Sequence, residues 1–231
     1  MLSTIEILIL SLVQGVFEFL PVSSSAHLLL ISKYFKFNNN SILIDLCLHL
    51  GSLIAIVFYF RKDLFNFIKN KNFLIKILIA TIPIIIVGYI LYETGLINHL
   101  RNIKIIAWMS LIFGIILYLS DKTKIKKKIK LNFSNKDAIF FGVLQTLSLI
   151  PGVSRSGITI TSGRMLGFSR FESAKISFFL SIPTLFAASS LAIFDIYKEG
   201  SPDLNFLALI SIIFSAFFSF LSIFFFLNFI K

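Results

Sequence analysis

The chain has 231 residues, of which 57% are hydrophobic, and its mean hydropathy is +0.91. Soluble domains contain about 45–50% apolar residues, so this composition excludes an ordinary soluble protein and indicates an integral membrane protein. The 22 Lys and Arg residues outnumber the 11 Asp and Glu residues, which gives a formal net charge of +11. Because the basic residues flank apolar segments, as the positive-inside rule predicts, they require no nucleic-acid partner.

Crossing about 30 Å of hydrocarbon takes roughly 20 residues, and five stretches are apolar and long enough to do so. We interpret the phenylalanine-rich last stretch as a lipid-facing span. The predicted spans are 42–60, 73–92, 103–120, 174–194 and 206–230.

Two further apolar stretches, 5–32 and 137–167, are each interrupted near the middle by a proline and several serines. Irregular backbone at membrane depth is tolerated only where it is buried in protein or lines a wet cavity. We therefore expect two re-entrant helix-loop-helix hairpins, each of which enters and leaves by the same face of the membrane.

Charge predicts the orientation of these hairpins. The segments 61–76 and 122–136 hold twelve of the 22 basic residues, so we expect both to be cytoplasmic loops. Hairpin 5–32 then enters from outside and hairpin 137–167 from the cytoplasm, and their tips meet near the bilayer midplane. We interpret the charges on Arg164, Arg170 and Lys175 as a solvated cytoplasmic edge.

The two hairpins also align with each other, since Gln14 matches Gln145 and Pro21 matches Pro151. Three spans follow the first hairpin, so the second copy is inserted upside down, as in inverted-repeat membrane proteins. The predicted fold is an all-α polytopic membrane helical bundle with inverted repeats, forming one transmembrane domain over 1–231. Repeat one covers about 1–120, with hairpin 5–32 and three spans, and repeat two covers about 137–231, with hairpin 137–167 and two spans.

The first hairpin carries polar groups that are costly in lipid and therefore suggest a functional site. We expect Pro21 to end the first helix and the serines to cap the next one, whose N-terminus would attract a phosphate. The alternative is that Pro21 only kinks a helix and the serines bond to backbone carbonyls. The polar groups are Gln14, Glu18, Ser23, Ser24, Ser25 and His27.

The second hairpin supplies a cation, because Arg155 lies among Ser154, Ser156 and Thr159. Arginine is always ionised and binds phosphate oxygens in a bidentate manner. Glu18 could instead be its partner in a structural ion pair, but two serine-rich helix starts favour a composite anion site. Asp45 and His49 are four residues apart and either extend this cluster or bond to each other.

Two motifs carry a family resemblance: Glu18 to His27 reads E-F-L-P-V-S-S-S-A-H, and Pro151 to Thr159 reads P-G-V-S-R-S-G-I-T. Both resemble the signatures of the undecaprenyl-diphosphate phosphatases, the bacitracin-resistance membrane phosphatases. The chain departs from the family in two ways. Gln14 replaces a frequent glutamate, and the second repeat lacks a final span, so we expect an oligomer partner, such as a second copy in a homodimer, to close that edge.

The resemblance implies hydrolysis of undecaprenyl diphosphate to undecaprenyl phosphate and phosphate, which recycles the lipid carrier for peptidoglycan synthesis. It also implies a multi-pass protein of the bacterial inner membrane. The charge-based topology then opens the active site to the periplasm.

By this resemblance, Arg155 clamps the diphosphate, and Glu18 holds a divalent cation, Mg²⁺ or Ca²⁺, or orients the nucleophile. Ser24 is the candidate nucleophile, with water as the competing one. His27 is the candidate general acid or base, and direct attack by His27 is a further alternative. The remaining substrate-binding candidates are Gln14, Ser23, Ser25, Ser154, Ser156 and Thr159.

Inverted repeats with broken helices are also the usual plan of secondary transporters, so the same site could move an anion or a lipid phosphate. The protein could also combine hydrolysis with movement of the lipid. The sequence does not separate these alternatives.

Overall fold

The computed structural model describes residues 3–37, 42–69, 71–96, 100, 102–129, 133–199 and 206–231. Within these ranges the regular elements are helices, apart from one isolated bridge between Lys127 and Phe168. The prediction of an all-α protein is confirmed. Three of the described helices, α5, α7 and α12, are long and apolar enough to cross a membrane.

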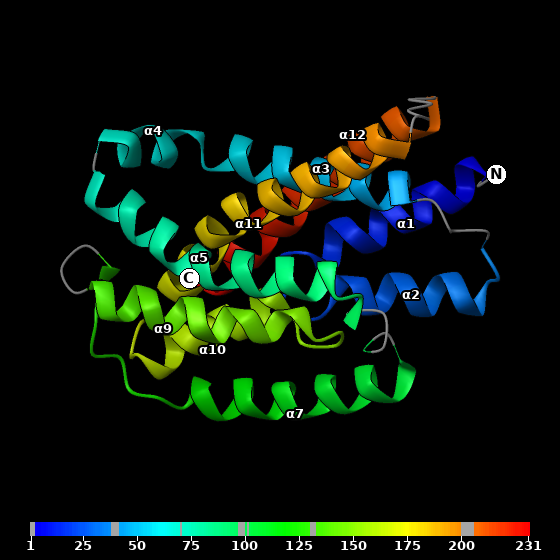
Figure 1. The fold of residues 1–231 in the computed structure, drawn as a ribbon. Coiled ribbons are helices and arrows are strands. Elements are labelled where there is room, and N and C mark those ends of the chain that lie inside the picture. The colour runs from blue at the N-terminus through cyan, green and yellow to red at the C-terminus, as the bar shows by residue number, and fades with distance from the viewer. Residues whose placement is uncertain are drawn as a thin grey trace.

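The predicted spans correspond to α3, α5, α7, α11 and α12, and the interrupted segments to the pairs α1–α2 and α9–α10 (Figure 1). The short helix α4 was not predicted, since its residues were assigned to a basic loop. The helices are α1 (Thr4–Phe17), α2 (Ser24–Tyr34), α3 (Ile42–Tyr59), α4 (Arg61–Lys69), α5 (Lys71–Glu93), α7 (Ile103–Asp121), α9 (Asn135–Gln145), the 3₁₀ helix η1 (Thr146–Leu149), α10 (Arg155–Met165), α11 (Arg170–Glu199) and α12 (Phe206–Phe229).

Both interrupted segments break where the proline and serine clusters predict. Ser23 caps α2, because its hydroxyl accepts a hydrogen bond from the backbone N–H of Ala26 at 3.3 Å. Ser154 caps α10 in the same way, accepting from the N–H of Gly157 at 3.1 Å. Figure 1 shows the two helix pairs extending toward opposite ends of the molecule, with both turns near its middle.

Helix α12 is a packing centre, so its interpretation as a simply lipid-facing span was wrong. It packs most extensively against α3 and α1. A stripe of serines spaced four residues apart faces α3: the Ser215 hydroxyl donates to the Leu48 carbonyl at 2.6 Å, and Ser219 donates to Ser52 at 2.9 Å. These bonds fix the register of α3, on which part of the site depends.

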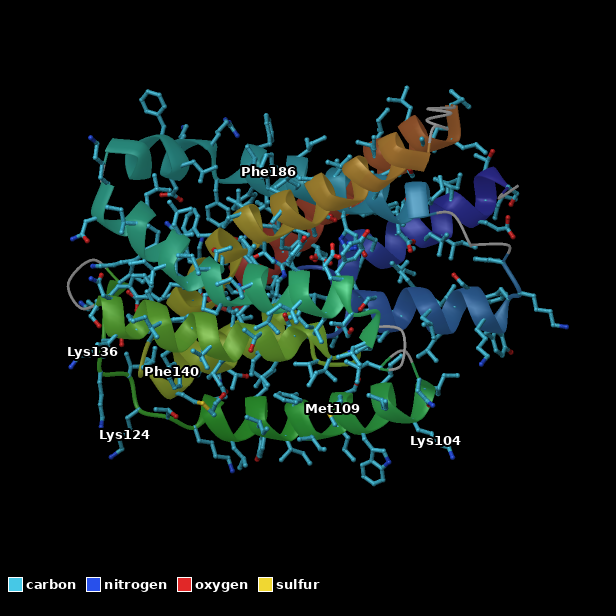
Figure 2. All side chains as sticks on the ribbon, viewed as in Figure 1. Lys104, Met109, Lys124, Lys136, Phe140 and Phe186 are labelled. Carbon is cyan, nitrogen blue, oxygen red and sulfur yellow. The ribbon has the colours of Figure 1, made fainter. Side chains whose placement is uncertain are left out.

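The described part of the lysine-rich segment is attached to the turn between α10 and α11. The backbone N–H groups of Lys126 and Lys127 both donate to the Gly167 carbonyl, at 2.8 and 3.1 Å. Figure 2 shows Lys124 and Lys136 at one end of the molecule, and Lys104 near the opposite end of α7. The described part of the lysine-rich segment therefore lies at one end of the bundle.

Arg164 does not belong to a solvated edge, and that interpretation was wrong. Its side chain is only 6% exposed and donates to the carbonyls of Phe168, Asp121 and Thr123 at 2.6–2.7 Å. The other two charges do lie nearer the surface. Arg170 pairs with Asp121, and Lys175 pairs with Asp63 of α4.

The α1–α12 contact allows a direct test of the packing. A Cβ atom at Gly15 would lie 2.5 Å from Cβ of Phe218 and 2.8 Å from the backbone N of Ser219. We expect Gly15→Ala to destabilise the protein by about 1–3 kcal/mol, because the backbones must separate. The measurement is the thermal unfolding midpoint in detergent.

The matched control is Gly114→Ala in α7, where a new Cβ has no heavy atom within 4 Å. This change should be neutral or stabilising by up to about 1 kcal/mol, because alanine favours helix. Equal unfolding midpoints for the two variants would contradict the described packing of α1 on α12.

Candidate active site

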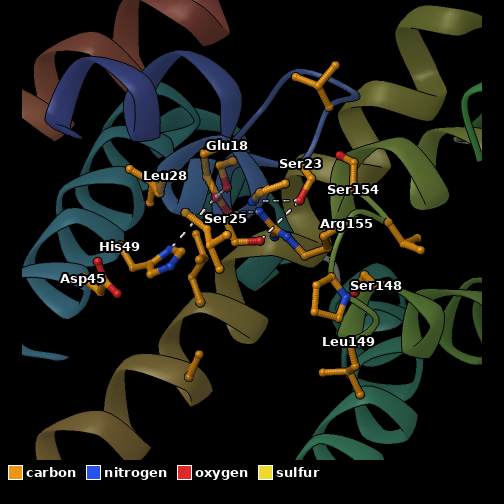
Figure 3. A pocket seen from close by; sticks show the side chains of 18 of the residues that line it. Glu18, Ser23, Ser25, Leu28, Asp45, His49, Ser148, Leu149, Ser154 and Arg155 are labelled. Atoms are coloured by element: carbon orange, nitrogen blue, oxygen red, sulfur yellow. Dashed lines mark hydrogen bonds and ion pairs between the residues drawn. The ribbon is translucent and has the colours of Figure 1, made fainter. Parts of the chain in front are cut away.

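The turns of the two interrupted segments meet at an ion pair. The guanidinium of Arg155, the first residue of α10, donates through NH2 to Oε1 of Glu18 at 2.6 Å. The Glu18 side chain is 6% exposed and the Arg155 side chain 14%. The structure therefore brings the acidic first turn and the cationic second turn together, as predicted, and Figure 3 shows this contact.

Glu18 receives two more hydrogen bonds, both on its second oxygen. The Ser24 hydroxyl donates to Oε2 at 2.7 Å, and Gln14 Nε2 donates to the same atom at 3.0 Å. Ser24 is the first residue of α2, and Gln14 lies one turn before Glu18 on α1. A carboxylate held by three donors has a fixed orientation, and it is placed to accept the Ser24 proton.

Serine hydroxyls hold the second turn against the first. Ser156 donates to the Leu20 carbonyl in a short hydrogen bond, and Ser154 reaches the same oxygen at 3.5 Å. Thr159, one turn further along α10, donates to Ser177 of α11 at 2.6 Å. Ser156 and Thr159, which were predicted to bind substrate, are thus engaged in joining helices, and neither is among the cavity-lining residues.

A cavity of about 740 Å³ adjoins the ion pair. Its polar end contains Glu18, Ser24 and Arg155, together with the predicted binding residues Ser23, Ser25 and Ser154 (Figure 3). The first-turn N–H groups of α2 and α10 have no acceptor within their own helices, so both helix starts favour an anion. The remaining walls are largely apolar and include Leu28, Leu29, Leu46, Ile84, Ile106, Leu149, Val153 and Leu185.

The two described histidines have different surroundings. His27 stacks on Phe17 with ring centroids 4.2 Å apart, its Nδ1 lies 2.7 Å from the Ser23 carbonyl, and it is not among the cavity-lining residues. His49 does line the cavity, and its Nδ1 lies 3.0 Å from Gln14 Nε2 and 4.0 Å from Glu18 Oε2. Sequence reasoning left His49 between an extension of the polar cluster and a bond to Asp45, and the structure places its ring beside Gln14 and Glu18.

The arrangement around Glu18 does not suit the predicted divalent cation. Mg²⁺ and Ca²⁺ need free carboxylate or carbonyl oxygens, whereas both oxygens of Glu18 already accept hydrogen bonds and one of them faces a guanidinium. Among the described residues, no group of three or more His, Cys, Asp or Glu side chains could hold a metal ion. We therefore derive no step through a metal held by Glu18.

The ion pair with Glu18 does not use every donor of the Arg155 guanidinium. Within the described ranges, the second guanidinium nitrogen of Arg155, NH1, is buried and has no hydrogen-bond partner. A buried donor without a partner is costly, so such groups are rare and usually have a reason. Arg155 thus retains an unpaired N–H donor beside the starts of α2 and α10.

Comparison with known proteins identifies the family. The family model described as "Bacitracin resistance protein BacA" matches residues 7–231. The chain belongs to this family. A protein named undecaprenyl-diphosphatase from Pelagibacter ubique (strain HTCC1062) is 54% identical over 228 residues, which cover 98% of this chain and 89% of the relative.

More distant relatives bear the same name. The undecaprenyl-diphosphatase of Elusimicrobium minutum (strain Pei191) is 38% identical over 100% of this chain and 90% of its own length. That of Ruegeria sp. (strain TM1040) is 37% identical over 87% of this chain and 80% of its own length.

The ion pair makes a stability prediction. We expect Arg155→Met to cost about 3–5 kcal/mol, because it leaves Glu18 buried with no counter-charge. Adding Glu18→Gln should recover most of this loss, since the amide is neutral. Thermal or denaturant unfolding in detergent measures both variants.

Arg170→Met is the matched control, because Arg170 is 65% exposed in its pair with Asp121. Its cost should stay within about 1 kcal/mol, as for other exposed pairs. If Arg155→Met were equally mild, or the second substitution gave no recovery, the two charges would not be paired as described.

Proposed function

We propose that this protein hydrolyses undecaprenyl diphosphate to undecaprenyl phosphate and inorganic phosphate. The observation that carries the proposal is a single cavity combining Arg155 and two helix starts with largely apolar walls. A diphosphate on a long isoprenoid needs both environments. Its family membership and the names of its relatives support the same substrate.

Ser24 is the proposed nucleophile. Its hydroxyl already donates to Glu18, so the carboxylate would take the proton as the oxygen attacks the terminal phosphorus. The bond to the bridging oxygen breaks, undecaprenyl phosphate leaves, and water later hydrolyses the phosphoserine. Phosphoryl transfer depends mainly on positioning and on charge stabilisation, which Arg155 and the two helix starts supply.

Attack by water is the competing scheme. Glu18 would then orient the water, and Ser24 would bind a phosphate oxygen. His27, the predicted acid or base, lies outside the cavity lining, and in its neutral form it could act only as a base. Its Nδ1 is engaged by the Ser23 carbonyl, which leaves Nε2 as the nitrogen that could exchange a proton.

In the membrane, we propose that α1–α2 and α9–α10 are re-entrant hairpins in an inverted repeat. The packing of the two halves supports this proposal. In the second half, the second span is α12, and it packs on α1 of the first hairpin. In the first half, the second span is α5, and it packs on α9 of the second hairpin. Each half thus supports the first hairpin helix of the other. By the positive-inside rule, the basic segments favour an outer position for the first hairpin, and the proposed cavity therefore opens to the periplasm of the bacterial inner membrane.

The activity is tested by adding a prenyl diphosphate to purified protein and measuring phosphate. We expect the natural chain to release phosphate, and Arg155→Ala and Glu18→Gln to lower the rate by at least about 10³-fold, because charge stabilisation or nucleophile activation is lost. Acid quenching should trap a phosphoserine that is absent from Ser24→Ala, and its absence from the natural chain would favour water.

Arg61→Ala and Glu6→Gln are the matched controls, because Arg61 lies on α4, Glu6 lies at the far end of α1 from Glu18, and neither side chain lines the cavity. They should keep full activity. No phosphate release by the natural chain, combined with anion flux in proteoliposomes, would favour the transporter alternative.

The orientation is tested by cysteine labelling of intact cells in a Cys47→Ala background, since Cys47 is the single cysteine. Val22, which lines the cavity and is 39% exposed, should react as Val22→Cys with an impermeant maleimide from outside. Lys124→Cys should react only after permeabilisation. The reverse pattern would refute the periplasmic opening.

A further inference from the structure

We propose that His49 binds the substrate, donating Nε2–H to a phosphate oxygen of the diphosphate, and that Gln14 sets the imidazole tautomer that makes this possible. The inference rests on the proposed function, because it names a further contact in the same site. It also gives a role to Gln14, the residue that replaces a frequent glutamate of the family.

His49 is well placed for this role. Its side chain is 33% exposed and lines the cavity, and Figure 3 shows the ring extending from α3 toward Ser25 and Glu18. The helix carrying it is held by the neighbouring hydrogen bond from Ser215 to the Leu48 carbonyl. Arg155 and His49 thus approach Glu18 from different helices.

The tautomer follows from a chain of hydrogen bonds. Glu18, paired with Arg155, is a carboxylate and can only accept, so the Gln14 amide must turn its NH₂ group toward Oε2, at 3.0 Å. The second N–H of that group points at Nδ1 of His49, also at 3.0 Å. Nδ1 must therefore be the acceptor, and the proton of the neutral ring lies on Nε2.

The opposite amide orientation is unfavourable. It would place Oε1 of Gln14 against the Glu18 carboxylate, with two acceptors facing each other. The tautomer of His49 is assigned from this hydrogen-bond network. The orientation of the Gln14 amide, and with it the tautomer, therefore depends on the buried ion pair between Glu18 and Arg155. The charged residues that line the cavity together with His49 are Glu18 at the end of α1, Lys33 on α2, Arg155 on α10 and Asp45 one turn earlier on α3.

His27 provides an internal contrast. Its Nδ1 lies 2.7 Å from the Ser23 carbonyl, which can only accept, so the proton of His27 lies on Nδ1. The two described histidines therefore have opposite tautomers. A glutamate in place of Gln14 would lie beside the Glu18 carboxylate in its protonated form, donating its proton to Oε2 of Glu18. The same hydroxyl oxygen of the new glutamate would accept from Nδ1–H and move His49 to the tautomer of His27, leaving an acceptor toward the phosphate.

The tautomer is read by ¹⁵N NMR of the full chain labelled at its three histidines, at about pH 8, where free imidazole is neutral. Signals are assigned by His49→Gln and His27→Gln. We expect an unprotonated Nδ1 for His49 and a protonated one for His27, with Gln14→Glu reversing only His49. A protonated Nδ1 on His49 in the natural chain would overturn the proposal.

Binding is measured by calorimetry with a non-hydrolysable prenyl diphosphonate. His49→Asn keeps an acceptor near the Nδ1 position but cannot reach the ligand, so we expect about tenfold weaker binding, as for loss of one hydrogen bond to a charged group. His49→Gln carries an N–H near the Nε2 position and should bind within about threefold of the natural chain. In turnover, KM should rise for His49→Asn more than kcat falls.

The outcomes separate this inference from the proposed function. Unchanged binding by His49→Asn, or equal losses in the Asn and Gln variants, would overturn the role of His49 while hydrolysis by the natural chain stands. If the natural chain binds the diphosphonate but hydrolyses no prenyl diphosphate, the proposed function fails and the binding series still decides the role of His49. Should His49→Asn fail to fold, the tautomer of the natural chain decides it.

Discussion

The buried ion pair between Glu18 and Arg155 is the interaction on which the site depends. The two residues are 137 positions apart in the chain, yet their charged atoms lie 2.6 Å apart. Neither charge could remain in an apolar bundle without the other, because a buried unpaired ion is strongly destabilising. The pair therefore fixes the two helix starts beside the same cavity.

A packed scaffold holds these turns in place. The serine stripe of α12 bonds to α3, the close contact at Gly15 brings α1 against α12, and serines of the second turn hold the Leu20 carbonyl of the first. As a result the Glu18 carboxylate, the Ser24 hydroxyl and the His49 ring are each positioned by a different helix. Preorganised polar groups of this kind are what phosphoryl transfer requires.

Much of this arrangement could be predicted from the sequence, because its signals are local. A proline followed by serines predicts a helix end and a new N-cap, and an intramembrane carboxylate and arginine each require a partner. The serine caps of α2 and α10 and the pairing of Glu18 with Arg155 follow from these rules.

Other features depend on tertiary register, which the sequence pattern does not specify. His49 meets Gln14 only because α3 is held against α12 at one particular offset. Arg164 is a charged residue near other charged residues in the sequence, which suggests a surface position, but its guanidinium donates to three backbone carbonyls. The sequence of α12 gives no sign that its serines form one contact surface, because they are scattered in a phenylalanine-rich span. Only the packing shows that they face α3.

The most direct measurement of the central claim is an experimental structure with a non-hydrolysable prenyl diphosphonate bound. The account predicts that the diphosphonate lies between the starts of α2 and α10, with Arg155 and the Ser24 hydroxyl in contact with its oxygens and the prenyl chain along the apolar walls. A head group bound elsewhere, or Glu18 and Arg155 separated in the complex without either touching the ligand, would contradict it.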